Sequence, residues 1–234
     1  MNRPRTVLVT RASEDCSPLE VLLRARDLVP VAMPCIELQA LDAEVPSDVD
    51  FVVVASPHAA RHLAPHLGRL TRARFAAVGA GTAEALPFRD VIVPSAGAGA
   101  DALLDVLGPL VHGKRVLLPG AEQGNPALPA QLAALGAEVV PVALYRTRTA
   151  SVADPQALAF LRVGGIDAIA FASGSAARGF VALAGAGAAS PCAVVCMGTL
   201  CAAEARKAGL RVDRESGGGL ADLADAIAAQ LSDR

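Results

Sequence analysis

The chain of 234 residues is poor in aromatic side chains: it has no tryptophan, one tyrosine and six phenylalanines. It also lacks an excess of charge, since 21 Lys and Arg stand against 23 Asp and Glu, and it contains no long block of one sign. Nucleic-acid-binding domains usually carry a basic surface, and charged blocks mark membrane-binding segments and tails. We therefore expect neither nucleic acid nor a membrane as a partner.

Charged residues are also missing between positions 179 and 203, and the mean hydropathy of the chain is high, at +0.44. Such a run is long enough to cross a bilayer. Gly185, Gly187 and the pair Ser190-Pro191 interrupt it, and alanine, which contributes little to insertion, fills most of the rest. We predict a helix, a turn and a strand here. Because the apolar stretch at 6–9 is too short for a signal peptide, we expect a cytoplasmic protein.

No two of the five cysteines form a C-x-x-C motif, and their spacing to the four histidines matches no zinc site. Cys192 and Cys196 would lie about 13 Å apart on one strand at roughly 3.3 Å per residue, beyond disulfide reach. His58, His62 and His66 recur at the spacing of one helix face, for which solvated histidines are a commoner explanation than a metal site. The sequence therefore predicts reduced core cysteines and no metal.

Motifs for nucleotide and nucleophile chemistry are absent or incomplete. Gly79-Ala80-Gly81 follows an expected strand, but the third glycine of a dinucleotide-binding motif would fall at Glu84. No GxxxxGK[ST] loop exists, and neither Ser56 nor Ser173 lies in a GxSxG motif. We therefore expect neither a dinucleotide cofactor nor a nucleoside triphosphate bound through a P-loop.

The chain repeats itself once. Its length fits one large or two small domains at about 150 residues per domain, and self-comparison favours two related halves. The offsets between matching segments run from 109 to 121 residues. The matches are Val7-Leu8-Val9 with Val116-Leu117-Leu118, Val29–Ala32 with Val140–Ala143, Asp50–Ser56 with Asp167–Ser173, Ala59–Arg61 with Ala176–Arg178, Ala77–Gly79 with Cys196–Gly198, and Ser95 and Asp101 with Ser216 and Asp222.

Strands and helices alternate along both halves. The expected strands are apolar runs at 6–10, 29–33, 51–55, 75–78, 91–94, 115–119, 138–143, 167–172, 193–197 and 211–215. Helical patterns lie between them, for example at 19–25, 127–135 and 220–231, and Gly136 is placed to cap the second of these. Apolar strands without alternation are typical of parallel sheets covered on both faces. We predict an α/β fold with two five-stranded parallel sheets flanked by helices.

Small and polar residues gather where the expected strands end, which is where open parallel sheets bind ligands. Each group precedes a helix, whose free N–H groups attract anions; helix capping alone is the simpler explanation for any single group. The groups are Thr10-Arg11, Ser56, Gly79–Thr82, Ser95–Gly99, Gly120, Ser173–Ser175, Gly198-Thr199 and Ser216–Gly219.

Tyr145 is the chain's one tyrosine, and the expected strand ends beside it in the run Tyr145-Arg146-Thr147-Arg148. A single tyrosine is often a packing residue. Its phenol could instead donate a proton to a leaving hydroxyl, with the arginines holding carboxylates nearby.

The ordered set of motifs resembles the uroporphyrinogen-III synthase family. The similar segments, which span nearly the whole chain, are Val7–Arg11, Pro34–Leu38, Asp50–Ser56, Ala77–Leu86, Leu135–Thr147 and Asp167–Ala176. The resemblance implies two α/β domains joined by two extended linkers: residues 1–38 with 148–234, residues 42–143, and linkers at 39–41 and 144–147.

The resemblance also implies a cofactor-free reaction. Hydroxymethylbilane loses water to give an azafulvene, and the substituted ring-D carbon attacks to form a spiro pyrrolenine. That intermediate fragments and recloses to uroporphyrinogen III with ring D inverted. Tyr145 is then the candidate that assists loss of the hydroxyl. The candidates for the substrate-binding cleft are Thr10, Arg11, Ser56, Thr82, Gly120, Ser173, Ser175 and Thr199.

Two positions depart from the family pattern. Ala12 stands where a proline usually follows the first Thr-Arg, and Cys201 occupies a place where a threonine is expected, which leaves Thr199 as a substitute. We expect a monomer, because no coiled coil or isolated apolar helix demands a partner. The alternative function is a non-catalytic, two-lobed protein that binds an anionic small molecule.

Overall fold

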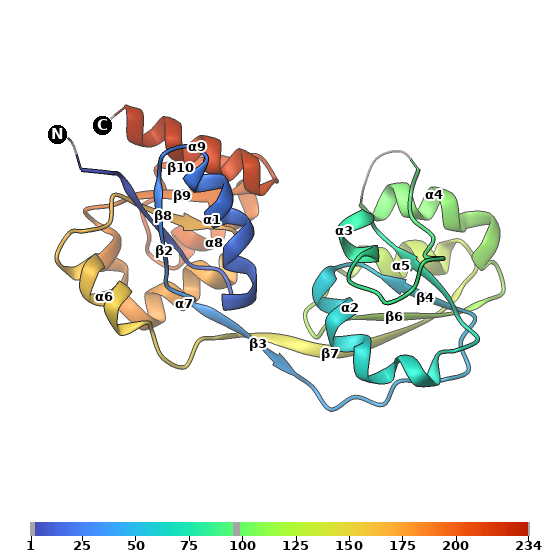
Figure 1. Ribbon diagram of the computed structural model, residues 1–234. Helices are drawn as coiled ribbons and strands as arrows, with labels where there is room; N and C mark the ends of the chain where they lie inside the picture. Colours follow the sequence, from blue (N-terminus) through green and yellow to red (C-terminus); the bar gives the residue numbers. More distant parts are fainter. Residues whose placement is uncertain (1–2, 96–98, 234) are drawn as a thin grey trace. The chain divides into compact units, whose positions relative to one another are not determined.

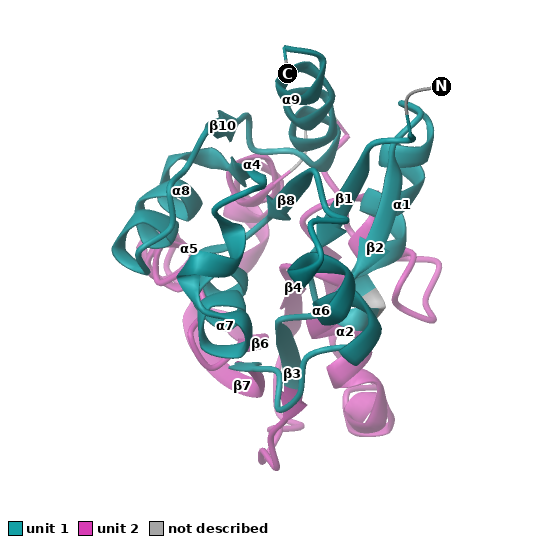
Figure 2. Ribbon diagram, turned by 90° about the vertical axis from the view of Figure 1, so that its left-hand side faces the viewer, with its two compact units in different colours: residues 1–38, 148–234 teal, residues 39–147 magenta. Residues whose placement is uncertain are grey.

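A computed structural model of the chain describes residues 3–95 and 99–233. The chain forms two compact units: unit 1 comprises Met1–Leu38 and Arg148–Arg234, and unit 2 comprises Gln39–Thr147. Figure 2 shows unit 1 in teal and unit 2 in magenta. Each unit has an α/β fold, and its sheet is built from strands that are distant in the sequence.

The sheet of unit 1 has the strand order β10-β9-β8-β1-β2 (Figure 1). β1 pairs in parallel with β2 and β8, and β9 pairs in parallel with β8 and β10. The strands are β1 (Thr6–Val9), β2 (Val29–Ala32), β8 (Ala168–Phe171), β9 (Ala193–Met197) and β10 (Arg214–Ser216).

Helices cover both faces of this sheet. Buried residues of α1 (Cys16–Arg24) and α9 (Leu220–Ser232) pack on one face. Buried residues of α6 (Pro155–Arg162), α7 (Gly174–Ala184) and α8 (Gly198–Lys207) pack on the other. Short 3-10 turns, η1 (Ser13–Asp15) and η3 (Ala186–Ala189), complete the unit. Coverage on two faces explains why β1, β8 and most of β9 are wholly buried, apolar runs.

The sheet of unit 2 has the order β3-β7-β6-β4-β5. β4 pairs in parallel with β5 and β6, and β6 pairs in parallel with β7. The strands are β3 (Ile36–Ala40), β4 (Phe51–Val54), β5 (Arg74–Ala77), β6 (Arg115–Ala121) and β7 (Glu138–Thr149). The helices are α2 (Pro57–Leu63), η2 (Ala64–Arg69), α3 (Ala80–Ala83), α4 (Ala100–Val111) and α5 (Ala127–Ala134).

The edge strand β3 corrects the prediction that both sheets are wholly parallel. The N–H of Leu41 donates to the carbonyl of Leu144 at 2.8 Å, and the N–H of Ala150 donates to the carbonyl of Cys35 at 3.1 Å. Residue numbers rise along β3 as they fall along β7, so the two strands are antiparallel. Residues 39–40 and 144–147, predicted as linkers, lie within these paired strands.

Three of the predicted strands differ in the structure. In the run predicted at 91–94, Ile92 makes an isolated bridge to Ala76, and Pro94 has no N–H with which to extend the ladder. The strand predicted at 211–215 is β10, which begins at Arg214; just before it, the Asp213 carboxylate accepts from the N–H of Val194. β7 continues to Thr149, so Tyr145 lies inside a strand rather than at its end.

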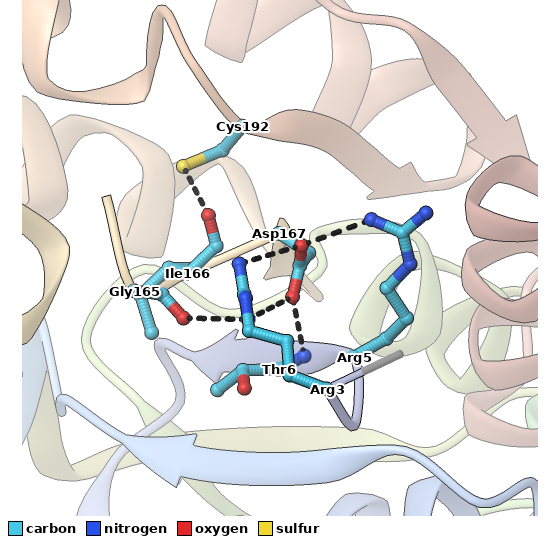
Figure 3. A network of polar contacts seen from close by, with 7 residues as sticks. All are labelled: Arg3, Arg5, Thr6, Gly165, Ile166, Asp167 and Cys192. Atoms are coloured by element: carbon cyan, nitrogen blue, oxygen red, sulfur yellow. Dashed lines mark hydrogen bonds and ion pairs between the residues drawn. The ribbon is translucent and has the colours of Figure 1, made fainter. Parts of the chain in front are cut away.

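In both units, an aspartate just before a central strand binds the first residue of the neighbouring strand. The carboxylate of Asp167, which precedes β8, accepts from the N–H of Thr6 at 2.7 Å and from Arg3 and Arg5 (Figure 3). Its repeat partner Asp50, which precedes β4, accepts from the N–H of Arg115 at 2.9 Å. In each unit, a carboxylate therefore fixes the beginning of the neighbouring strand, β1 or β6.

All five cysteines, which lie in the described part of the chain, are buried thiols outside any disulfide, as expected for core residues. Burial raises the pKa of the Cys35 thiol to about 12. A hydrogen bond with Cys201, together with burial, raises the pKa of Cys196. Both of these thiols therefore stay protonated near neutral pH. Within the described part of the chain, no helix is long and apolar enough to span a bilayer.

Candidate functional site

Unit 2 contains a cavity of about 590 Å³ beside the carboxyl ends of its strands β4 and β6. Most of its wall is apolar or backbone, and its polar side chains come from Ser56, Glu122, Asn125 and Tyr145. The apolar part of the lining is drawn from Ala55, Ala59, Val78, Leu118, Pro119, Leu128, Pro129, Pro141, Val142 and Ala143. Such a wall suits the face of a flat ring, with a few polar groups to orient it.

The beginnings of three helices line this cavity. Ser56 is the N-cap of α2, Gly99 is the N-cap of α4 and Pro126 is the N-cap of α5. Helix N-termini present N–H groups and the positive end of the helix dipole, and so favour carboxylates. Some of these donors are absent or used: residue 57 is a proline, the N–H of Ala59 donates to Ser56, and that of Ala127 donates to Asn125. The attraction for an anion therefore rests on the helix dipoles and the remaining N–H groups, since the described lining contains no lysine or arginine.

Tyr145 lies at the wall of the cavity and is 7% exposed. The register between β6 and β7 shifts at Gly120/Ala121, so that Gly120 faces Ala143 while Ala121 faces Tyr145. Such a bulge re-aims the side chains that follow it. The Tyr145 hydroxyl oxygen lies 3.5 Å from the Ser56 hydroxyl oxygen. Three predicted site residues, Tyr145, Ser56 and Gly120, thus meet at one cavity.

Two histidines of α2 surround the phenol ring. The His62 ring stacks on it, with centroids 4.6 Å apart and an interplanar angle of 17°, and the His58 ring lies tilted at 6.1 Å. The sequence interpretation had these histidines on a solvated face and missed their contact with Tyr145. Their spacing of four residues did place them on one face of a helix, but the partner of that face is set by tertiary packing.

The basic residue beside Tyr145 has protein partners. Arg146 donates through Nε to the side-chain oxygen of Gln39 at 3.1 Å, and its NH1 atom lies 3.9 Å from Glu122. Both contacts are exposed and therefore cost little to exchange for a ligand carboxylate.

The strand-end candidates of unit 1 lie at the ends of the adjacent strands β1 and β8. Thr10 is buried, and its hydroxyl donates to the carbonyl of Ala170 at 2.8 Å, so its proton is used inside the sheet. Arg11 donates to the carbonyl of Asp15 at 3.1 Å and pairs with its carboxylate. Ser173 caps α7, and its hydroxyl lies 2.9 Å from that of Ser175.

Two candidates remain, Thr82 in unit 2 and Thr199 in unit 1. Thr82 is 5% exposed within the short helix α3 and does not line the cavity. Thr199 is exposed in the first turn of α8, whereas Cys201 points into the core and donates to the carbonyl of Phe171 at 3.4 Å. Residues 96–98 of the predicted Ser95–Gly99 turn lie outside the described residues.

Metal-ligating side chains do not cluster in the part of the chain that the structure describes: it holds no group of three or more His, Cys, Asp or Glu residues suited to an ion. The site residues that it does bring together are a phenol, two imidazoles and a serine hydroxyl, which are groups for proton donation and hydrogen bonding.

Comparisons with known proteins point in one direction. A family model described as uroporphyrinogen-III synthase HemD matches residues 17–218. The uroporphyrinogen-III synthase of Synechococcus elongatus is 29% identical over an alignment of 198 residues, with coverage of 76% of this chain and 74% of that protein. A family model that covers most of the chain identifies its family directly.

Solved structures share the fold. The structure of uroporphyrinogen-III synthetase from Helicobacter pylori has a TM-score of 0.65 at 16% identity and covers 98% of this chain and 100% of that one. A mutant uroporphyrinogen III synthase from Thermus thermophilus has a TM-score of 0.50 at 20% identity, with 98% and 100% covered. With its two five-stranded sheets and its match over residues 17–218, the chain belongs to the uroporphyrinogen-III synthase family of cyclising hydro-lyases in haem biosynthesis.

Proposed function

We propose that this chain cyclises hydroxymethylbilane to uroporphyrinogen III, with loss of water and inversion of ring D, and that it does so at Tyr145. The observation that carries the proposal is the family match over residues 17–218, within which Tyr145 lines a cavity in unit 2.

In the proposed first step, the Tyr145 hydroxyl gives its proton to the hydroxymethyl oxygen of the substrate. The carbon–oxygen bond breaks, water leaves, and the electron pair of the pyrrole nitrogen produces an azafulvene. The substituted carbon of ring D then attacks the exocyclic carbon, and the resulting spiro pyrrolenine fragments and recloses. Loss of the last ring proton returns a proton to the phenolate, so the net change is the loss of one water molecule.

Binding of the carboxylates is the second part of the proposal. The substrate has eight carboxylates, and the N-termini of α2, α4 and α5 offer N–H groups at one cavity. In unit 1 we propose contacts with Thr10, Arg11, Ser173, Ser175 and Thr199; in unit 2 we propose contacts with Ser56, Thr82 and Gly120. Fixing a flexible tetrapyrrole in one geometry supplies much of the rate, so few chemical groups are needed.

We also propose that units 1 and 2 act as the two domains, with residues 39–41 and 144–147 as linkers, in a cytoplasmic monomer. This is supported by the passage of the chain from unit 1 to unit 2 in β3 and back in β7. Light scattering on the purified chain tests the monomer directly, because a dimer would double the measured mass.

The competing function is a binding protein that holds an anionic small molecule without turnover. To decide, hydroxymethylbilane is generated enzymatically and the cyclised isomers are separated with and without this chain. We expect the type III isomer, whereas spontaneous closure without inversion gives type I. A product mixture that stays type I at high protein concentration would refute the synthase and favour the binding protein.

A further inference from the structure

The ring of Tyr145 is held from two sides by one helix. His62, near the end of α2, stacks on the ring with centroids 4.6 Å apart, and Ser56, the N-cap of the same helix, lies 3.5 Å from the hydroxyl oxygen. A stacked neighbour restricts rotation of the phenol, and the capping serine marks where its hydroxyl points. α2 therefore fixes both the ring plane and the hydroxyl direction.

The backbone on the other side also directs this side chain. The bulge in β7 places Tyr145, rather than Leu144, opposite Ala121 of β6. The carbonyls on both sides of the bulge are bonded, that of Leu144 to the N–H of Leu41 and that of Tyr145 to the N–H of Glu122, each at 2.8 Å. With the backbone fixed in this way, rotation of the side chain is the main freedom left to Tyr145.

Unit 1 shows that the fold itself does not require the His62–Tyr145 contact. By the repeat, Ser173 corresponds to Ser56, and Gly179 then corresponds to His62. A Cβ at Gly179 would lie 2.1 Å from the carbonyl oxygen of Cys35, so the helix there packs directly on backbone. The equivalent helix of unit 1 thus packs without an aromatic ring at this position, and the stacked pair of His62 and Tyr145 is specific to unit 2.

We propose that His62 is a positioning residue for the reaction: it holds the phenol of Tyr145 by ring stacking so that the hydroxyl stays at Ser56 and the cavity. This inference rests on the proposed function, because it assigns His62 a part in the proton donation by Tyr145. A ring displaced by about 1 Å can cost on the order of a hundredfold in rate.

Tyr145 provides its own signal, because the chain has one tyrosine and no tryptophan. Its emission therefore reports this position alone and needs no substrate. We expect His62→Ala to change the emission and to lower kcat about tenfold to a hundredfold, with KM within about twofold of wild type. His62→Phe, which keeps a ring in the stack, should return both signals toward wild type. His66→Ala, four residues further along, is the matched control and should change neither.

The proposal is overturned if His62→Ala has wild-type emission and kcat, or if His62→Phe is as impaired as His62→Ala. Should His62→Ala fail to fold, His62→Leu against His62→Phe makes the same comparison of bulk with ring; equal kcat values in these two would also overturn it. The proposed function fails separately, when the wild-type chain makes no type III isomer, and the emission of the variants then still decides whether His62 holds the ring.

Discussion

Units 1 and 2 share a serine-capped helix after a central strand, but the side chains on that helix differ. In both, a serine stands two residues after the end of a strand (β8 or β4), and its hydroxyl accepts from the N–H of the residue three positions later, at 3.2 Å for Ser173 and 3.1 Å for Ser56. Two residues after this serine, unit 1 has Ser175, which contacts Ser173. At the same position unit 2 has His58, whose ring faces Tyr145.

The side chains of α7 in unit 1 and α2 in unit 2 also differ one helical turn later. At the next equivalent position, Gly179 packs on the Cys35 carbonyl in unit 1, and His62 stacks on Tyr145 in unit 2. The offset that aligns Val29–Ala32 with Val140–Ala143 places Pro34 at the position of Tyr145. The serine-capped helix after a central strand is thus common to both units. The phenol of Tyr145 and the imidazoles beside it belong to unit 2.

The largest effect should come from removing the phenol hydroxyl, which only unit 2 possesses. We expect Tyr145→Phe to lower kcat by about tenfold to a thousandfold, the usual range for a proton-transferring group. Thermal unfolding serves as the control and should shift little, since the contact of the hydroxyl with Ser56 is long, at 3.5 Å. Unchanged kcat would remove Tyr145 from the chemistry and make the two units equivalent.

The next effect tests the close packing that is peculiar to unit 1. Gly179→Ala places a methyl group against the Cys35 backbone, which cannot rotate away, and should destabilise the chain by about 1–3 kcal/mol. Denaturant unfolding measures this loss. Gly187→Ala, also in unit 1 but with open space around the new methyl group, is the matched control. Equal stability of the two variants would show that α7 can move away from the backbone at Cys35.

The paired aspartates should differ because their burial differs. The Asp167 side chain is 8% exposed and that of Asp50 is 45% exposed. Asp167→Asn loses charged hydrogen bonds to Thr6, Arg3 and Arg5 and should cost about 1.5–3 kcal/mol, clearly more than Asp50→Asn. Urea unfolding of both variants gives the comparison; a larger loss for Asp50→Asn would contradict it.

Asp50 also predicts a pH dependence. The N–H of Arg115, with help from Lys114, holds the pKa of Asp50 below its ordinary value of 3.8. The unfolded chain therefore takes up the proton first as the pH falls. The ionised Asp50 carboxylate stabilises the folded chain fully at a pH above its ordinary pKa. This stabilisation is lost as the pH falls through the lowered pKa of the folded chain. Asp50→Asn should flatten the fall in stability in that acid range, and a curve parallel to wild type would contradict the assignment.

The smallest effects should come from the two capping serines. Ser56→Ala and Ser173→Ala each remove one N-cap bond and should each cost about 1 kcal/mol. Only Ser56→Ala should also alter the emission of Tyr145, since Ser56 lies beside its hydroxyl. Thermal unfolding and emission spectra of both variants test this pair. A change in emission with Ser173→Ala alone would contradict the assignment of the surroundings of Tyr145 to unit 2.

Features with a local cause were predictable from the sequence. β1, β4 and β8 are uninterrupted apolar runs that are buried throughout, and the repeat was visible in them. Gly136 caps α5 as predicted: it adopts a φ of +86°, where other residues are strained, and a Cβ there would meet the His112 ring at 2.3 Å.

Features that depend on a distant partner were not predictable. β3 is a half-exposed edge strand with polar residues at alternate positions, and only its pairing with β7 makes it a strand. The contact of His62 with Tyr145 joins residues that are far apart in the sequence and depends on a bulge without a sequence signal. The hydroxyl of Thr10 donates to the carbonyl of Ala170, a partner on the neighbouring strand that the sequence alone does not identify.

The most direct test of the account follows the emission of wild-type Tyr145 while uroporphyrinogen III is added under anaerobic conditions, with binding measured in parallel by calorimetry. Because no other tyrosine or tryptophan contributes, a saturable change in emission at the calorimetric affinity would place the tetrapyrrole at Tyr145. We predict that change. Calorimetric binding with unaltered emission would contradict the claim that unit 2, at Tyr145, carries the chemistry.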